Sequence, residues 1–191
     1  MKHSPGVLLV KTTHQKVLAF FLARPSGFFY GSEVSKKTGV SIGQVSKILN
    51  DLRRAGLVEK ETKGKTELYR VLTDSAVLRT YKVLTTLISI EPLVEGLKKV
   101  SRLVILYGSC AKGTNVEESD LDLLVVSSVR DKVQDTVARF LYDEGRGFSE
   151  IKPVIKRPAA WASLEQNDPS FYGELQKGIL LYEKEIDESR L

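Results

Sequence analysis

The sequence predicts an α+β protein of two domains, and three observations lead to this prediction. The N-terminal half contains three segments with the apolar spacing of helices, followed by two alternating strands. The C-terminal half contains apolar strands next to glycines and acidic residues. Residues 1–90 carry 15 Lys and Arg against 6 Asp and Glu, whereas residues 91–191 carry 14 against 18. We therefore expect a basic, nucleic-acid-binding domain over residues 1–90 and an acidic domain with a different task over residues 91–191, the alternative for the basic half being a solvated lysine-rich surface.

The composition narrows the class of protein before any motif is considered. A chain of 191 residues, 42% of them hydrophobic, is long enough for two small cores. No run of about 18 apolar residues could span a bilayer, and the apolar run near the N-terminus is too short for a secretory signal. The single cysteine, Cys110, excludes an internal disulfide and a multi-cysteine zinc site. We expect a cytoplasmic protein with no membrane partner.

Helical spacing and capping residues place three helices in the basic half. Residues 13–23 have apolar residues at helical spacing. A short aromatic strand follows, and then a helix for which Ser32 is the expected N-cap and Gly39 the expected stop. A third helix begins at Ser41, which has capping-box spacing to Gln44. Its apolar stripe, which we expect in the core, comprises Ile42, Val45, Ile48, Leu49 and Leu52.

A predicted β-hairpin completes this half. The segment "LVEKETKGKTELYRVL" alternates on both sides of "KGK", which is typical of two strands joined by a tight turn with a basic tip. Three helices followed by a hairpin is the order of a winged helix.

The segment "EVSKKTGVSIGQVSKILNDLRRAGLVEKE" resembles the helix-turn-helix of winged-helix transcriptional regulators of the ArsR or MarR kind. The resemblance covers roughly residues 10–90 and implies that the third helix enters the major groove of double-stranded DNA. It assigns DNA contacts to Gln44, Lys47, Asn50 and Arg54 on the helix and to Lys63 and Lys65 on the wing. The alternative is a winged helix used for protein contacts, with these residues as a solvated face.

A further helix is expected from residue 75 to about residue 90, where "EP" breaks the pattern before a second short helix that runs to Val100. Such a helix can serve as a dimerisation arm, and a symmetric homodimer would suit a DNA site made of two half-sites. The alternative is that it packs against the second domain.

The stretch "LYGSCAKGTNVEESDLDLLVV", residues 106–126, carries the chemistry of the acidic half. A buried strand ends at Gly108, where a glycine turn exposes backbone N–H groups and the Ser109 hydroxyl to an anion. In the next strand, period-two alternation places Asp120 and Asp122 on one face. Paired carboxylates beside a phosphate loop suit Mg²⁺, which binds one or two carboxylates and substrate phosphates.

The Gly108-Ser109 pair, Gly113 and the Ser-Asp-Leu-Asp run that begins at Ser119 resemble the signature of the polymerase-β-type nucleotidyltransferase superfamily, closest to its minimal branch. The resemblance covers roughly residues 93–185 and implies a mixed sheet with flanking helices. It also implies a nucleoside triphosphate bound by Gly108 and Ser109, with Mg²⁺ bound by Asp120 and Asp122 as metal ligands and catalytic residues.

This sequence differs from that superfamily at the position of the third acidic residue. Members that transfer a nucleotidyl group carry another carboxylate on a later strand, which here is expected to be "FSEIKPVIK". Alternation makes Glu150 a candidate catalytic residue, but the superfamily's register falls on Lys152. A lysine cannot bind Mg²⁺ but could neutralise a triphosphate, so Lys152 is a candidate nucleotide-binding residue.

These expectations combine into one function and two alternatives. We expect a DNA-binding transcriptional regulator whose second domain binds a nucleoside triphosphate with Mg²⁺ as a sensor. The first alternative is an active nucleotidyltransferase, which transfers a nucleoside monophosphate to a hydroxyl of a protein or small molecule, as antitoxin-type relatives do. The other is a scaffold that binds neither DNA nor nucleotide.

Overall fold

The computed structural model describes residues 12–64, 66–73, 75–140 and 148–184. The chain divides into two compact units, Met1–Ile88 and Ser89–Leu191. The first unit combines helices with a small sheet and the second combines a larger sheet with helices, which confirms the α+β fold class. Among the described residues, no helix is both long enough and apolar enough to cross a membrane.

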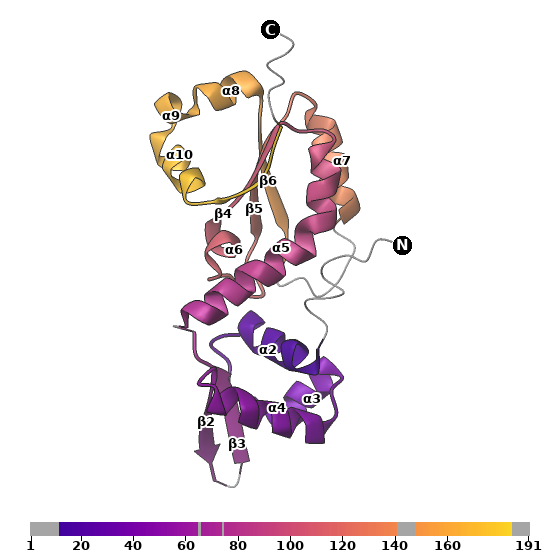
Figure 1. Cartoon of the computed structure of the whole chain (residues 1–191), viewed down its shortest axis with the longest axis vertical. Helices are drawn as coiled ribbons and strands as arrows, with labels where there is room; N and C mark the ends of the chain where they lie inside the picture. The colour runs from indigo at the N-terminus through magenta and orange to yellow at the C-terminus, as the bar shows by residue number, and fades with distance from the viewer. Residues whose placement is uncertain (1–11, 65, 74, 141–147, 185–191) are drawn as a thin grey trace. The chain divides into compact units, whose positions relative to one another are not determined.

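The first unit has the predicted order of three helices and a hairpin (Figure 1). Its sheet is antiparallel, with strand order β1-β3-β2. Gly64, at the tip of the hairpin, has φ +64°, a left-handed conformation that favours glycine. The elements are α2 (Thr13–Ala23), β1 (Phe29–Tyr30), α3 (Gly31–Thr38), α4 (Ile42–Arg54), β2 (Val58–Lys63) and β3 (Thr66–Val71).

A single apolar core holds these elements together. Val17 and Phe21 of α2, Val34 of α3 and Val45 of α4 are fully buried within it. The Phe20 and Phe29 rings meet edge to face, with centroids 4.8 Å apart, a favoured geometry for aromatic rings. Helices α2 and α4 therefore share one core with the small sheet.

Three local predictions in this unit are wrong. The second helix, α3, begins two residues earlier than predicted, because Tyr30 and not Ser32 is its N-cap and the Tyr30 N–H donates to Glu33 (2.8 Å). Ser41 is the N-cap of α4, but its hydroxyl donates to the Gln44 side chain (3.2 Å) instead of forming a capping box. Ile42, expected in the core, is 56% exposed, because it is the first residue of α4 and the buried stripe of the helix begins only at Val45.

One long helix, α5 (Ala76–Lys98), replaces the two predicted helices, and Pro92 lies inside it. Proline removes one intrahelical hydrogen bond, but packing compensates for the loss. Ile90, Leu93, Val94 and Leu97 are all buried around Pro92, so burial of one helix face outweighs the local breaking signal. The boundary between the two units falls within this helix.

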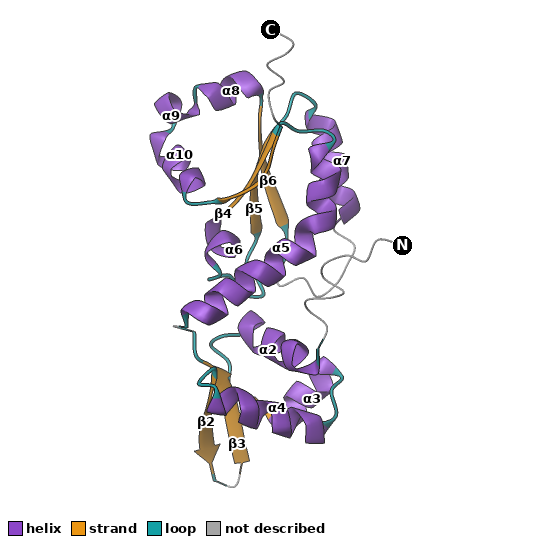
Figure 2. Cartoon of the chain, in the orientation of Figure 1, coloured by secondary structure: helices purple, strands orange, loops and turns teal. Residues whose placement is uncertain are grey.

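The second unit is built on a four-stranded mixed sheet with strand order β6-β5-β4-β7 (Figure 2). β4 pairs antiparallel with β5 and β7, whereas β5 and β6 are parallel. Figure 1 shows α8, α9 and α10 on one side of the sheet and α7 on the other. Its elements after α5 are β4 (Leu103–Tyr107), α6 (Gly108–Lys112), β5 (Leu121–Val126), α7 (Arg130–Phe140), β6 (Ile151–Lys156), α8 (Pro158–Ala162), α9 (Leu164–Asn167), α10 (Pro169–Gln176) and β7 (Ile179–Glu183).

Both faces of the central strands are covered. All six residues of β5 except Asp122 are buried, and the first four residues of β4 are buried as well. Leu164 of α9 and Leu175 of α10 join the core on one face, where Trp161, Phe171 and Tyr172 pack as partly buried side chains. Because the rest of β5 is buried, Asp122 is the position at which a charged group enters an otherwise apolar strand.

Candidate functional site

The acidic pair lies at the start of β5, beside two neighbouring strands. Asp120 immediately precedes the strand and Asp122 is its second residue, so alternation places both carboxylates on one face. The parallel register with β6 pairs Asp122 with Lys152, and the antiparallel register with β4 pairs it with Tyr107. Three strands therefore bring an acid, an amine and a phenol to one edge of the site.

Asp120 has a basic partner and a hydroxyl partner. Its Oδ2 lies 2.7 Å from the Lys152 Nζ, and its Oδ1 accepts a hydrogen bond from the Ser149 hydroxyl (3.1 Å). The hydrogen bond from Lys152, followed by that from Ser149, lowers the pKa of Asp120 despite partial desolvation. The same contact raises the pKa of Lys152. Both groups are therefore charged at neutral pH.

Asp122 has a different environment. Burial, and then repulsion from Asp120, raise its pKa, and only the nearby Lys152 opposes these effects. Its carboxylate packs directly against Gly108, where any β-carbon would overlap Asp122 Oδ2. Gly108 also has φ +71°, a conformation that other residues rarely adopt. The glycine of the Gly-Ser pair is thus required both by the backbone and by the neighbouring acid.

The Gly-Ser pair opens the short helix α6, directly after β4. The strand ends at Tyr107, one residue before the predicted end, because Gly108 already starts the helix. Since Tyr107 pairs with Asp122, the backbone of Gly108 and Ser109 lies beside the acidic pair. Gly113 ends the helix with φ +68°.

Cys110 of this helix is buried, and its Sγ lies 3.4 Å from the Asp120 carbonyl oxygen, which indicates a packing role for this side chain.

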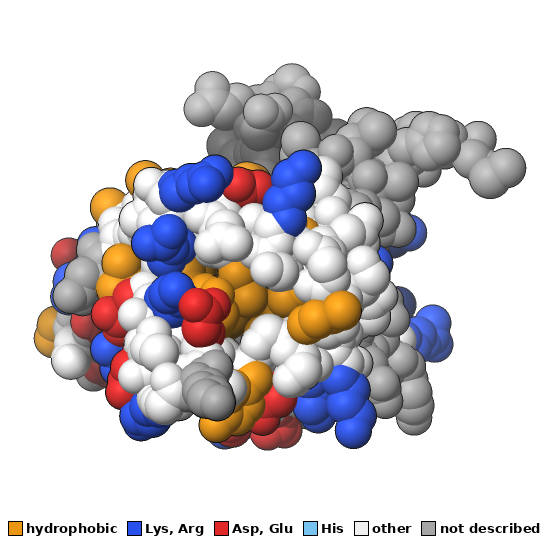
Figure 3. Space-filling view, turned by 90° about the horizontal axis from the view of Figure 1, so that it is seen from below, with side chains coloured by type: hydrophobic (Ala, Val, Ile, Leu, Met, Phe, Trp, Pro, Cys, Tyr) orange, Lys and Arg blue, Asp and Glu red, His pale blue; other side chains and the backbone are white. Residues whose placement is uncertain are grey.

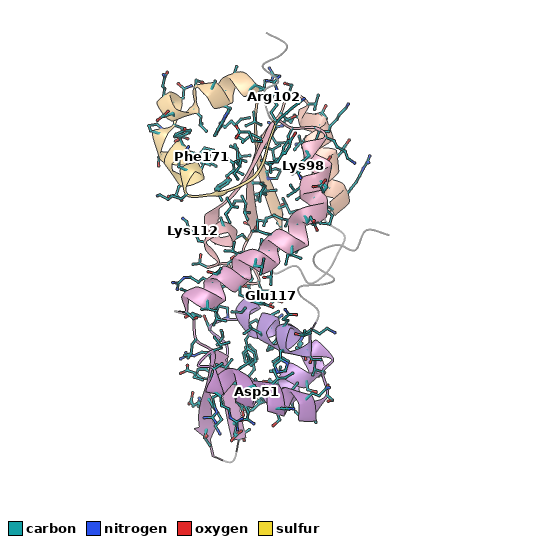
Figure 4. All side chains as sticks on the ribbon, in the orientation of Figure 1. Asp51, Lys98, Arg102, Lys112, Glu117 and Phe171 are labelled. Atoms are coloured by element: carbon teal, nitrogen blue, oxygen red, sulfur yellow. The ribbon has the colours of Figure 1, made fainter. Side chains whose placement is uncertain are left out.

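Two contacts hold this loop against the rest of the unit. The Lys112 Nζ of α6 lies 3.0 Å from Glu174 Oε2 of α10. The Tyr107 and Phe171 rings meet edge to face, with centroids 5.5 Å apart. Figure 4 labels Lys112 on α6 and Phe171 on α10. Helix α10 therefore contacts both ends of the segment from Tyr107 to Lys112, which contains Gly108 and Ser109.

Glu150 lies one residue before β6 and is exposed. Its carbonyl oxygen accepts from the Leu121 N–H (2.7 Å), which extends the parallel register by one residue and aligns it with Asp120. Its charge contributes to the raised pKa of Lys152. Sequence reasoning missed Ser149 and Tyr107, because nothing in their local pattern indicates that Ser149 donates to Asp120 or that Tyr107 pairs with Asp122 across the sheet.

The carboxylates of this site could supply only part of the coordination shell of one cation. Within the described part of the chain, no three His, Cys, Asp or Glu side chains form a metal cluster. Asp120 and Asp122 supply two carboxylates, which suits Mg²⁺ when phosphate oxygens and water complete its shell. On the same face, the Lys152 ammonium lies 2.7 Å from Asp120 Oδ2.

The residues expected to contact DNA lie on α4 and the hairpin. Gln44, Lys47 and Arg54 are exposed and Asn50 is half-buried. Lys63 is exposed, with its Nζ 3.4 Å from Glu61 Oε1. Lys65 lies outside the described residues.

Ion pairing distinguishes the helix lysines from the hairpin lysines. Lys60 pairs with Glu67 across the hairpin (2.6 Å), and Arg70 pairs with Glu59. Four exposed helix lysines of this unit make no ion pair with any described residue: Lys16 of α2, Lys36 and Lys37 at the end of α3, and Lys47 of α4. Figure 3 shows acidic and basic side chains interspersed on the face that it views. The lysines without an ion pair among the described residues of this unit therefore lie on its helices, whereas Lys60 and Lys63 of the hairpin each lie beside a glutamate.

Two family models match the chain. Residues 89–187 match the family described as polymerase beta, nucleotidyltransferase. Residues 26–73 match the family described as sugar-specific transcriptional regulator TrmB.

A relative and two solved structures are also similar. A Methanocaldococcus jannaschii protein, provisionally named a protein adenylyltransferase, is 33% identical over 90 residues, which span 43% of this chain and 58% of that protein. A provisionally assigned nucleotidyltransferase from Sulfolobus solfataricus has 15% identity and a TM-score of 0.37, with 59% of this chain and 93% of that chain covered. TrmBL2, an archaeal chromatin protein whose structure shows a mode of DNA binding, has 15% identity and a TM-score of 0.32, with 89% and 74% covered.

Proposed function

Because the chain belongs to the polymerase beta nucleotidyltransferase family, we propose that its second unit binds a nucleoside triphosphate with Mg²⁺ and serves as the sensor of a DNA-binding transcriptional regulator. The TrmB-like regulator segment in the first unit supports the DNA-binding half of the proposal. The observation that supports the sensor half is the Lys152–Asp120 ion pair, because an ammonium beside the acidic pair can neither bind a metal nor accept the proton of an acceptor hydroxyl.

Each residue of the site has a role in this proposal. Gly108 and Ser109 bind the phosphates through backbone N–H groups and the hydroxyl. Asp120 and Asp122 would hold the cation, which when bound neutralises phosphate charge. Lys152 neutralises the remaining phosphate charge without activating an acceptor hydroxyl. The site then binds nucleotide and releases it largely unchanged.

Nucleotide titration tests this assignment. The double variant Asp120→Asn, Asp122→Asn should lose Mg²⁺-dependent affinity for ATP, because neutral amides bind a hard cation far more weakly than carboxylates. Isothermal titration calorimetry with and without Mg²⁺ measures the difference. Equal Mg²⁺-dependent affinity in the wild type and the variant would remove these two residues from the site.

Nucleotidyl transfer is the second candidate, and two observations favour it. The Methanocaldococcus jannaschii relative carries the name of a protein adenylyltransferase, and Glu150 aligns with Asp120 next to Lys152. In this alternative, Glu150 accepts the proton of an acceptor hydroxyl on a protein or small molecule.

Labelling with α-³²P-ATP separates the two candidates. As a nucleotide binder, the wild type should label itself and added proteins poorly, and Lys152→Asp should gain transfer by supplying the third carboxylate. Efficient labelling by the wild type that is abolished in Glu150→Gln would instead make the protein an enzyme with Glu150 as its third acid.

The first unit is proposed to bind double-stranded DNA through α4. Its exposed Gln44 and the half-buried Asn50 face base edges, whereas Lys47, Arg54 and the wing residues Lys63 and Lys65 contact phosphates. We also propose that the chain binds as a homodimer, since a two-fold symmetric pair reads two half-sites. Analytical ultracentrifugation on a selected DNA site checks this stoichiometry.

Two single lysine variants test the DNA interface. Lys47→Ala should weaken binding to all sequences and flatten the dependence of log affinity on log salt by about 0.9 for each phosphate that the side chain neutralises. Lys60→Ala is the matched control, because that lysine is already neutralised by Glu67. Gln44→Ala should instead reduce discrimination between sequences. Identical salt slopes for the wild type and Lys47→Ala would exclude Lys47 as a phosphate-binding residue.

A further inference from the structure

Lys152 and Ser149 together occupy both carboxylate oxygens of Asp120 that a cation would need. Asp120 Oδ2 is 2.7 Å from the Lys152 ammonium, and Asp120 Oδ1 accepts from Ser149. Asp122 Oδ2 packs against Gly108. A divalent cation approaching the pair therefore meets a positive charge at contact distance from its first ligand, and that charge repels it.

The position of Lys152 is set by the sheet, whereas its head group is free to move. The parallel register places Lys152 beside Asp122, so its side chain leaves the sheet on the face that carries both acids. The side chain is 56% exposed, and a lysine stem has four flexible carbons. The ammonium can therefore turn from Asp120 toward another anion without displacing the backbone.

We propose that nucleotide binding opens the cation site, so that the triphosphate binds first and the divalent cation second. The inference rests on the proposed nucleotide-binding function. A triphosphate bound at Gly108 and Ser109 brings several negative charges next to Lys152 and draws its ammonium away from Asp120. The freed carboxylate oxygen and the phosphate oxygens then bind the cation together. Lys152 thus excludes the cation from the empty site and supports the nucleotide in the filled one.

Thermodynamic linkage between nucleotide binding and cation binding gives this inference a quantity that can be measured. If nucleotide increases cation affinity by some factor, cation must increase nucleotide affinity by the same factor. Removal of the ammonium should weaken this coupling, since Asp120 is then available to the cation before nucleotide arrives.

The experiment measures cation affinity of the full-length chain by Mn²⁺ electron paramagnetic resonance, with and without a saturating ATP analogue that has a methylene α–β bridge. Without nucleotide, Lys152→Gln should bind Mn²⁺ about tenfold more tightly than the wild type, within the usual range of coupling between sites. With the analogue, the difference should shrink or reverse. Lys156→Gln is the matched control, because it removes the same charge four residues along β6.

The outcomes distinguish failure of the proposed nucleotide-binding function from failure of the proposed gating role of Lys152. If the analogue does not bind the wild type, the proposed function fails. If it binds but nucleotide-free wild type and Lys152→Gln have equal Mn²⁺ affinity, or neither binds Mn²⁺ measurably, the gating role of Lys152 is refuted. Lys152→Met repeats the comparison, and circular dichroism confirms that each variant is folded.

Discussion

At the scale of single residues, the two acids of β5 have opposite effects on stability. Lys152 and Ser149 stabilise the charged form of Asp120, so its pKa in the folded chain lies below the ordinary aspartate value of 3.8. Burial and the neighbouring Asp120 destabilise charged Asp122, so its pKa lies above 3.8. Asp120 therefore stabilises the fold above about pH 4 and loses this contribution as the pH falls through its folded pKa. Asp122 destabilises the fold progressively as the pH rises from about 3.8 to its higher folded pKa, and in full above that pKa.

Urea denaturation at neutral and acidic pH tests this difference in sign. At pH 7, Asp122→Asn should increase the free energy of unfolding and Asp120→Asn should decrease it. Both differences should vanish at low pH, where the carboxyls are protonated in the folded and unfolded chain. Two changes of the same sign at pH 7 would contradict the assignment of separate environments.

At the scale of elements, α5 shows packing that overrides a local signal. Pro92 is exposed within the helix, whereas Gly96 faces α7, where a β-carbon would lie 2.8 Å from the Thr136 Cγ2. Both residues disfavour helices, but only the proline can be replaced without a steric conflict. Their substitution by alanine should therefore have unequal effects.

Pro92→Ala should raise the free energy of unfolding by up to about 3 kcal/mol, because it restores a helical N–H and removes the ring clash. The larger freedom of the unfolded chain offsets part of the gain. Gly96→Ala, the control, should fall short of the propensity gain of about 1 kcal/mol because its methyl meets Thr136. Chemical denaturation measures both, and a stabilised Gly96→Ala beside an unchanged Pro92→Ala would refute this account of α5.

At the scale of the whole molecule, the proposed sensor requires that nucleotide and DNA affect each other's affinity. Helix α5 contributes residues to both units, so the two binding functions are joined by one continuous element. ATP analogue with Mg²⁺ should change the affinity for a selected DNA site by about tenfold, a usual coupling between two sites. Fluorescence anisotropy measures the change.

The reciprocal titration is the control for this coupling. DNA must change nucleotide affinity by the same factor, and the Asp120→Asn, Asp122→Asn variant should bind DNA equally with and without nucleotide. If nucleotide binds the wild type but leaves DNA affinity unchanged, the two units act independently and the sensor role is wrong.

Local patterns in the sequence were sufficient for the features that depend on neighbouring residues. The helix Thr13–Ala23 follows from its apolar period, and the glycines at 39 and 64 mark a helix end and a hairpin tip because each has a positive φ. Alternation along β5 likewise predicted that Asp120 and Asp122 share a face. In each case the determining interaction lies within a few residues of the chain.

Only the tertiary structure decided the features that depend on residues far apart in the chain. The exposure of Ile42 and the continuation of α5 through Pro92 depend on which surfaces are buried, which local periodicity does not specify. The contact of Lys152 with Asp120 depends on the parallel register of β5 and β6. A shift of one residue in that register would turn Lys152 to the other face of the sheet, because side chains alternate along a strand.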